Sequence, residues 1–327
     1  MGHRTRAALA LGSGGARGYA HIGAIEMLEE RGIEIVSVAG VSMGALVGGL
    51  YAAGKLADYT EWVRALTQFD ILRLLDVSLS KPGVIRAEKV FARVHEMVGD
   101  TRIEDLPIPF TAVATDLLAR KAVWIQRGPV EVAMRASIAM PGVFTPVMLN
   151  GRLLVDGGLM DPVPIAPTAS AESDLTIAID LGGERGGQME GAPVSETAEE
   201  RPTEEWVERF RRTTSHILDR ELVRALMSRF SGTANANAAV AADEPVEPPG
   251  HTPPGLGKFD VMNQSLEAMQ SVLTRYRLAG NPPDVLVTVP KDVCRTLDFH
   301  RASEMIEVGR IRTAQALDAA AITGLWP

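Results

Sequence analysis

Cysteine is almost absent from this sequence, and its scarcity restricts the class of protein. Cys294 is the only cysteine in 327 residues, so no disulfide can form within the chain. A scaffold held together by disulfides is therefore excluded, and a lone thiol fits a reducing compartment. We expect a cytoplasmic protein stabilised by an apolar core, because the chain is long and 46% of its residues are hydrophobic.

Basic residues are also too few for a typical nucleic-acid-binding protein. The formal net charge is −8 at pH 7, which argues against nucleic acid as a partner. No group of His, Cys and Asp residues has the spacing of metal ligands, so we expect neither a metal nor another cofactor. A signal peptide is not predicted, because the apolar start at residues 7–11 is short and ends at Gly12.

Long uncharged runs are rare as well. Residues 35–54 form a stretch of 20 residues without a charge, in which Gly40, Gly44 and Gly48 recur every four residues. A membrane-spanning helix with a close-packing face could have this pattern. However, the stretch also contains two serines, a tyrosine and five glycines, which are poor lipid-facing residues. It therefore predicts a buried strand, a turn and a buried helix.

That uncharged stretch contains the first of three motifs that carry chemistry. Gly40-Val41-Ser42-Met43-Gly44 lies between an apolar strand-like run and a run of small residues. This is the context of a nucleophile elbow, in which a serine occupies a sharp turn and flanking glycines leave room for it. The hydroxyl would lie at the amino end of a helix, which favours developing negative charge. Ser42 is therefore the predicted nucleophile.

A serine hydroxyl needs a base, and the sequence offers a carboxylate for that role. Asp156 ends the apolar run 153–155 and is followed by Gly157 and Gly158, which leave its side chain uncrowded. The histidines after Ser42 lie in surroundings that do not resemble a site: His95, His216, His251 and His300. Asp156 is the predicted base, and a Ser-Asp-His esterase that uses His300 is the alternative.

The third motif is a glycine-rich turn between a strand and a helix, Gly12-Ser13-Gly14-Gly15-Ala16-Arg17-Gly18. Its N–H groups would point at an anion, and Arg17 would make the surroundings electropositive. A dinucleotide site is not favoured, because Ser13 takes the place of the first glycine of that pattern and the second strand ends without an acid. Three other polar residues are expected to be structural rather than catalytic: His21, Asp116 and Asp180.

Together, the three motifs resemble those of the patatin-like phospholipase family. They occur in the family's order and at ordinary spacing, and the segment 136–144 and the tail around residues 284–299 are also similar. The resemblance covers roughly residues 5–180 and 258–320. One departure is that the family's glycine loop often opens Asp-Gly-Gly-Gly, whereas this loop opens Gly12-Ser13-Gly14-Gly15.

The resemblance implies an activity and a set of site residues. It implies a Ser–Asp dyad, with Ser42 as nucleophile and Asp156 as base. It also implies an oxyanion hole formed by the N–H groups of Gly14 and Gly15, with Arg17 beside them. The remaining motif glycines are Gly12, Gly18, Gly40, Gly44, Gly157 and Gly158. The implied function is that of a serine lipid acyl hydrolase, similar to a phospholipase A or an esterase, which cleaves a lipid or acyl ester through an acyl-enzyme.

Strand and helix patterns alternate along the chain, which favours a three-layer α/β/α fold around a central, mostly parallel sheet. This agrees with the patatin-like fold that the resemblance implies. Asn150-Gly151, between two apolar runs, predicts a tight hairpin. Helices are expected near residues 19–31, 43–53, 57–67, 87–98, 129–137, 260–279 and 303–321, and strands near 109–114, 121–126, 176–180 and 284–289.

Composition divides the chain into a catalytic core over residues 1–182, an insert over 183–257 and a C-terminal part of the core over 258–327. The insert predicts an amphipathic helix over 206–230 between flexible, partly disordered flanks. The sequence leaves open whether this helix is a lid, a peripheral membrane contact or a subunit interface. A homo-oligomer, and a non-enzymatic adaptor that binds a membrane or a regulator, are left open too.

Overall fold

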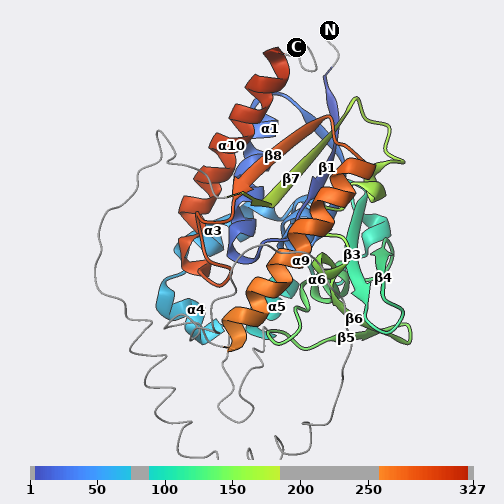
Figure 1. Ribbon diagram of the computed structural model, residues 1–327, viewed down its shortest axis with the longest axis vertical. Helices are drawn as coiled ribbons and strands as arrows, with labels where there is room; N and C mark the ends of the chain where they lie inside the picture. The colour runs from blue at the N-terminus through green and yellow to red at the C-terminus, as the bar shows by residue number, and fades with distance from the viewer. Residues whose placement is uncertain (1–3, 75–87, 185–257, 323–327) are drawn as a thin grey trace, which may run out of the picture. The chain divides into compact units, whose positions relative to one another are not determined.

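A central eight-stranded sheet organises the fold, in the order β5-β6-β3-β2-β1-β7-β8 with β4 paired to β3 beside this path (Figure 1). The computed structural model describes residues 4–74, 88–184 and 258–322, which belong to one compact unit. The pairs that join β3, β2, β1, β7 and β8 are parallel, and β4, β5 and β6 pair antiparallel. The strands are β1 (Arg6–Leu11), β2 (Glu34–Val41), β3 (Phe110–Asp116), β4 (Lys121–Ile125), β5 (Val147–Leu149), β6 (Arg152–Asp156), β7 (Leu175–Gly183) and β8 (Val285–Pro290).

Helices cover both faces of this sheet, because the side chains of each strand alternate between the faces. Leu9 and Leu11 of β1 belong to the main core, whereas Ala10 packs on the other face with Val163. Residues of α1, α2, α6 and α10 complete the main core, and α9 crosses the opposite face (Figure 1). The helices are α1 (Ala20–Glu30), α2 (Met43–Ala52), α3 (Leu56–Ala65), α4 (Gln68–Leu74), α5 (Glu88–Val98), α6 (Val130–Ile138), α9 (Lys258–Gly280) and α10 (Ala302–Ile322). The predicted three-layer α/β/α fold is confirmed.

The elements expected from the sequence are present with small shifts at their ends. The predicted hairpin turns at Asn150 and Gly151, with φ of 51° and 75°. Residues 35–54 form β2, a turn and α2, and within the described ranges no helix is long and apolar enough to cross a membrane. Helix α4 was not predicted. The predicted helix over 206–230, and the insert beyond residue 184, lie outside the described residues and stay predictions.

The register of β3 brings two distant parts of the chain together. Residues 110–113 of β3 pair with β2, and residues 114–116 pair with β6. Strand β4 pairs with residues 112–116 and so overlaps both stretches. Since a strand has only two edges, β2 and β6 must share the edge opposite β4. The end of β6 therefore lies directly beyond the end of β2, which places Asp156 next to Ser42.

Candidate active site

Ser42 occupies the tight turn between β2 and α2, as its motif predicts. Its backbone has φ of 56° and ψ of −127°, a conformation that a non-glycine residue rarely adopts. A Cβ added to Gly40 would lie 2.3 Å from the carbonyl oxygen of Gly44, and one added to Gly44 would lie 2.2 Å from that of Leu11. Gly40 is therefore required for the chain to close this turn, and Gly44 is required for the turn to pack against the end of β1.

The side chains of Ser42 and Asp156 are in direct contact. The Ser42 Oγ donates a hydrogen bond of 2.6 Å to Asp156 Oδ2, across 114 residues of sequence. The other carboxylate oxygen, Oδ1, accepts a bond of 2.7 Å from the N–H of Gly158. Gly157 allows this approach, because a Cβ there would lie 2.1 Å from the carbonyl oxygen of Val113. Both carboxylate oxygens of Asp156 thus have a fixed partner.

Burial alters the acidity of this carboxyl group. Asp156 is 2% exposed, and the loss of solvent raises its pKa from 3.8 to about 6. The hydrogen bonds from Ser42 and Gly158 act in the opposite direction, because they stabilise the carboxylate. The group is therefore ionised at neutral pH and is a stronger base than an ordinary aspartate.

Sequence reasoning missed a residue that holds the nucleophile turn in place, Ser137 of α6. Its hydroxyl accepts a hydrogen bond of 2.9 Å from the N–H of Ser42 and donates one of 2.6 Å to the carbonyl of Val113. Ser137 is completely buried. Ser137 thereby links Ser42 to β3. Strand β3 also pairs with β6, which ends at Asp156. The only sequence signal was its place in the segment 136–144.

We expect Ser137→Ala to lower kcat/KM on the order of 10- to 100-fold, because an untied turn misplaces the Ser42 hydroxyl. The free energy of unfolding should also fall by about 1–3 kcal/mol, since two buried polar groups lose their partner. Ester hydrolysis and chemical denaturation measure the two effects. Thr168→Val is a matched control, because Thr168 is a buried hydroxyl that bonds the Ile165 carbonyl away from the dyad. Unchanged turnover in Ser137→Ala would show that the Ser42 turn keeps its conformation without the hydrogen bonds of Ser137.

The glycine-rich turn leaves two N–H groups free beside the dyad. The N–H groups of Gly12, Ser13 and Ala16 donate to backbone carbonyls of other segments. Among the described residues, no group accepts a hydrogen bond from the N–H of Gly14 or Gly15. Gly15 has φ of 56°, and it lines the same pocket as Ser42. These two groups remain available to an anion at that point.

The other residues of this turn brace it against the rest of the fold. One Arg17 Nη donates to the carbonyls of Lys291 and Cys294 at 3.2 and 3.1 Å, and the other lies 3.5 Å from Glu267 of α9. Arg17 therefore lies beside the glycine loop, as expected, but it also holds the segment between β8 and α10. Gly12 and Gly18 allow close packing, because added Cβ atoms would lie 2.7 Å from the Ile179 carbonyl oxygen and 2.3 Å from the Met43 Cβ.

The described histidines do not contact the dyad. His21 is fully buried, its Nε2 lies 2.8 Å from the carbonyl oxygen of Gly12, and burial lowers its pKa to about 4. His95 bonds Glu131, and His300 is exposed. No hydrogen bond links any of the three to Ser42 or Asp156, whereas His216 and His251 lie outside the described residues. Over the described ranges, no cluster of acids, histidines and cysteine could hold a metal ion.

The two other aspartates that were expected to be structural make local contacts with the backbone. Asp116 Oδ1 accepts a hydrogen bond from the N–H of Ala119, and Asp180 Oδ1 accepts one from the N–H of Gly182. The first contact fits the turn role predicted for Asp116, and the second is a local contact within β7.

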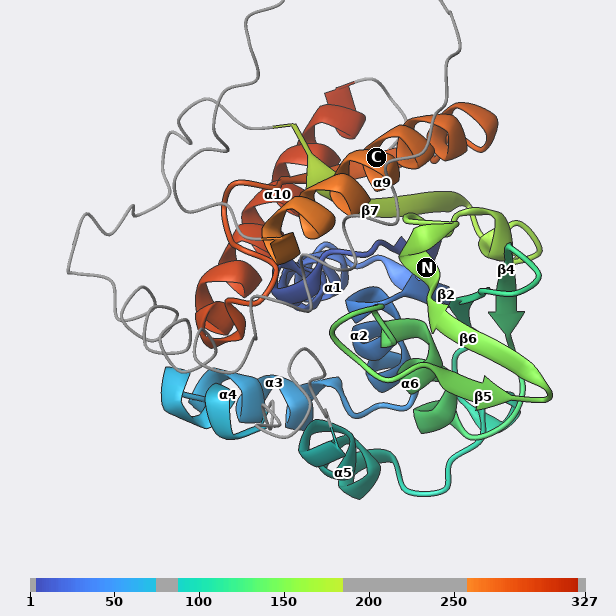
Figure 2. The same ribbon diagram turned by 60° about the horizontal axis from the view of Figure 1, so that its bottom comes forward.

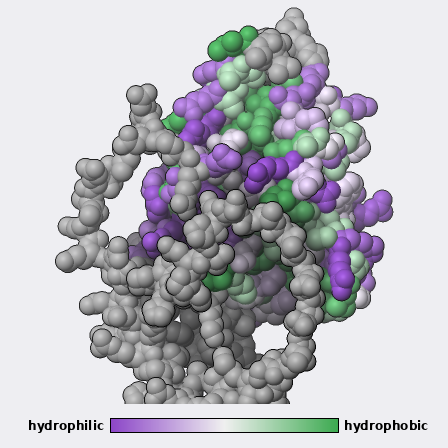
Figure 3. All heavy atoms as spheres, viewed as in Figure 1, coloured by the Kyte–Doolittle hydropathy of each residue, from purple (hydrophilic) through white to green (hydrophobic). Residues whose placement is uncertain are grey.

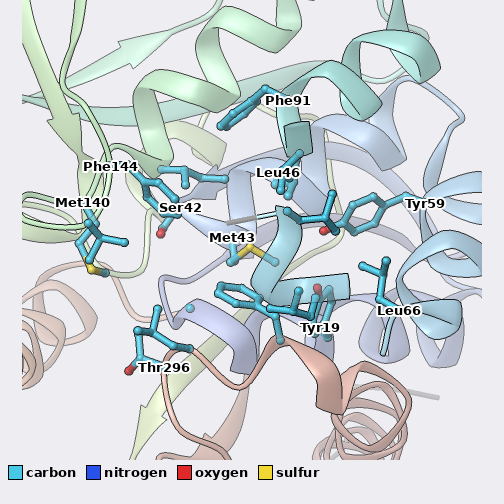
Figure 4. A pocket seen from close by; sticks show the side chains of 18 of the residues that line it. Tyr19, Ser42, Met43, Leu46, Tyr59, Leu66, Phe91, Met140, Phe144 and Thr296 are labelled. Carbon is cyan, nitrogen blue, oxygen red and sulfur yellow. The ribbon is translucent and has the colours of Figure 1, made fainter. Parts of the chain in front are cut away.

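An apolar pocket opens beside Ser42 (Figure 4). Ser42 lies at one end of it, and Tyr59 and Leu66 lie at the other. Its walls come from α2 to α5, from the segment after α6 and from the segment between β8 and α10. Most of the lining side chains are apolar: Tyr19, Met43, Leu46, Tyr59, Trp62, Leu66, Ile71, Leu74, Val90, Phe91, Ile138, Met140, Val143, Phe144, Leu297 and Phe299. On the side of Asp156, a smaller and more polar pocket adjoins the glycine loop and α9.

Comparison with known proteins places the chain in a family. A sequence model for patatin-like phospholipases matches residues 9–169. An uncharacterized NTE family protein of Mycobacterium tuberculosis is 50% identical over 336 residues, which cover 96% of this chain and 92% of that protein. This chain belongs to the NTE family of patatin-like phospholipases. The resemblance inferred from the three motifs is thereby confirmed.

More distant similarities are also found. The lysophospholipase nte1 of Emericella nidulans is 32% identical over 182 residues, which cover 53% of this chain and 12% of that protein. The crystal structure of VipD from Legionella pneumophila aligns with a TM-score of 0.43 and 15% sequence identity, over 97% of this chain and 67% of that chain. The family assignment rests on the mycobacterial relative.

Proposed function

We propose that this chain is a serine lipid acyl hydrolase in which Ser42 is the nucleophile and Asp156 the general base. The observation that carries the proposal is the 2.6 Å hydrogen bond from Ser42 Oγ to Asp156 Oδ2 at the end of an apolar pocket. The membership of a lipid-hydrolysing family supports the same reaction class. Ser42 thus lies where the polar groups needed for ester cleavage meet an apolar pocket that could hold an acyl chain.

Acylation would begin when Asp156 accepts the Ser42 proton as Ser42 Oγ attacks the ester carbonyl. The carbonyl oxygen then becomes an oxyanion, and the free N–H groups of Gly14 and Gly15 would stabilise it. The amino end of α2 adds a favourable dipole at the same point. Collapse of this intermediate breaks the bond to the leaving alcohol, which takes the proton from Asp156. The product at this stage is an acyl ester of Ser42.

Deacylation would repeat the same steps with water. Asp156, ionised again, removes a proton from a water molecule that attacks the acyl-Ser42 carbonyl. The N–H groups of Gly14 and Gly15 stabilise the second oxyanion as they did the first. The Ser42 oxygen leaves and recovers its proton from Asp156, which restores the starting state and releases a fatty acid.

The substrate class follows from the pocket. Its lining is almost entirely apolar on one side of Ser42, whereas Asp156, Arg17 and Glu267 lie on the other side. A lipid ester fits this division, with the acyl chain among the apolar side chains and the alcohol part toward the polar residues. The name of the Emericella relative, a lysophospholipase, is compatible with a substrate of this kind.

A fluorophosphonate probe tests the proposal most directly, because it labels only a serine that is activated as a nucleophile. Wild type should be labelled, and Ser42→Ala should not. Ser265→Ala is the matched control, since Ser265 is an exposed serine of α9 and its loss should leave labelling unchanged. Absence of labelling in the folded wild type would contradict the enzyme proposal and favour an adaptor.

The raised pKa of Asp156 predicts the pH dependence of activity. The base must be ionised in the free enzyme, and its pKa is about 6. We therefore expect kcat/KM for a soluble ester to be nearly constant above pH 7 and to fall about tenfold per pH unit well below pH 6. A histidine-free mechanism should give one acidic limb, which His300→Ala leaves in place. Loss of hydrolysis by a folded His300→Ala would instead support the Ser-Asp-His alternative.

A further inference from the structure

We propose that the β3–β4 turn and the β5–β6 hairpin form a docking surface for lipid membranes that contain anionic headgroups. We call this surface the hairpin patch and define it by residues 117–121 and 147–153. The proposal depends on the proposed function only for the expectation that the enzyme meets lipid. Membrane binding by the hairpin patch does not require Ser42 or Asp156, so the two proposals can fail separately.

Large apolar side chains are exposed on the hairpin patch. Leu118 is 76% exposed and Met148 is 66% exposed, and Leu117 beside them is 44% exposed. Leu117 N–H donates to the carbonyl of Leu153, and Leu153 pairs with Met148. Residues paired across neighbouring strands present their side chains on the same face of a sheet. Leu117, Leu153 and Met148 therefore form a continuous row rather than scattered contacts with solvent, and Leu118 adds to it at the turn.

The charged residues of the hairpin patch are all positive, although the register places Lys121 and Arg152 on the opposite face of the sheet from the apolar row. Arg120, Lys121 and Arg152 are exposed, and the hairpin patch contains no acidic residue. Asp116, the nearest acid in sequence, is buried 3.9 Å from Arg152. Such a cluster contrasts with the net charge of −8 for the whole chain. A pair of turns that carries both exposed apolar side chains and exposed cations matches the interface of a membrane with anionic lipids better than it matches water.

The hairpin patch is joined to the apolar pocket at the active site. Val143 and Phe144 line the pocket, and Met148 follows only four residues later, so the chain between Phe144 and Met148 spans at most about 14 Å. Figure 2 shows β5 and β6 on one side of α2, and α3, α4 and α5 on the other. At the lower right of Figure 3, where Figure 1 places this hairpin, hydrophobic and hydrophilic residues meet at the surface. A membrane bound there would supply lipid near the entrance to the pocket.

Vesicle sedimentation tests the hairpin patch without interference from hydrolysis when every protein carries Ser42→Ala. We expect binding to vesicles of phosphatidylcholine mixed with phosphatidylglycerol, and weaker binding to phosphatidylcholine alone. Adding Leu118→Asp and Met148→Asp should weaken the partition coefficient at least about tenfold. Adding Arg120→Gln and Lys121→Gln instead should remove most of the preference for phosphatidylglycerol.

The controls distinguish membrane docking from self-association and from a general loss of folded protein. Ile322→Asp changes a side chain that is 88% exposed at the end of α10, away from the hairpin (Figure 1), and should leave vesicle binding unchanged. With Ser42 restored, the hairpin variants should hydrolyse a short soluble ester at the wild-type rate. Equal vesicle binding by wild type and Leu118→Asp/Met148→Asp would overturn the proposal. So would a dimer that these substitutions dissociate, because the hairpin patch would then be an interface between copies.

Discussion

Replacing Ser42 by alanine, or Asp156 by asparagine, should reduce the rate of ester hydrolysis at least about 10³-fold. The remaining rate would be that which substrate binding and the oxyanion hole alone support. The first change removes the attacking oxygen, and the second removes the group that accepts its proton. Hydrolysis of p-nitrophenyl esters measures both. The two losses should not add in the double variant, because the residues act in the same step. Near wild-type turnover by Asp156→Asn would eliminate the Ser–Asp mechanism.

The stability of Asp156→Asn separates a catalytic loss from a folding defect. An asparagine can accept the Gly158 N–H bond and donate to Ser42, so the contacts of the site can persist. Between pH 4 and pH 6 the folded protein retains a proton on Asp156 that the unfolded chain has lost, because burial raises the pKa to about 6. The free energy of unfolding therefore falls as pH rises from 4 to 6. Above pH 6 the buried carboxylate lowers it by about 3 kcal/mol in total. Asp156→Asn should be at least as stable as wild type at pH 7.5 in chemical denaturation.

Much of the fold and of the site could be predicted because the relevant signals are local. Asn150-Gly151 fixes a hairpin through its own backbone preferences, and the observed φ values are positive at both residues. Gly40 reflects a steric requirement within its own motif, because a side chain there would collide with the carbonyl of Gly44. The glycine-rich turn and Ser42 follow the parallel strands β1 and β2, whose carboxyl ends lie at one edge of the sheet, whereas Asp156 ends the antiparallel strand β6. Family resemblance then supplied which strand ends belong together.

The features that escaped prediction depend on contacts between distant segments. Ser137 bonds the Ser42 N–H across 95 residues, and nothing in its neighbours marks that role. Arg17 bonds the segment 291–294, whose position depends on how α10 packs against α1. The hairpin patch was missed because Leu117, Leu118 and Met148 look like core residues until the register places them at the surface. Helix α4 is short, and the role of its residues Ile71 and Leu74 becomes clear only in the folded structure, where they line the pocket.

The far end of the apolar pocket should set the length of the acyl chain that the enzyme accepts. Ser42, the proposed nucleophile, lies at one end of the pocket, and Leu66 lies at the other, just after α3 (Figure 4). The acyl chain of an ester bound at Ser42 should therefore reach Leu66 only when that acyl chain is long. Each methylene that is excluded from an apolar site forfeits about 0.8 kcal/mol. The pocket should consequently discriminate between long chains while it treats short chains alike.

Leu66→Trp should shorten this pocket by about three methylenes and so cost about 2–3 kcal/mol, on the order of 50-fold in kcat/KM, for a palmitoyl ester. A butyryl ester does not reach Leu66, and its hydrolysis should remain at the wild-type rate. Leu66→Met is the matched control, because it nearly conserves volume and should change neither rate. The ratio of kcat/KM for the two esters is the measurement, since it cancels any general loss of active protein. If Leu66→Trp slows both esters equally, the substitution has disturbed the dyad, and if the ratio is unchanged, the acyl chain occupies another path from Ser42.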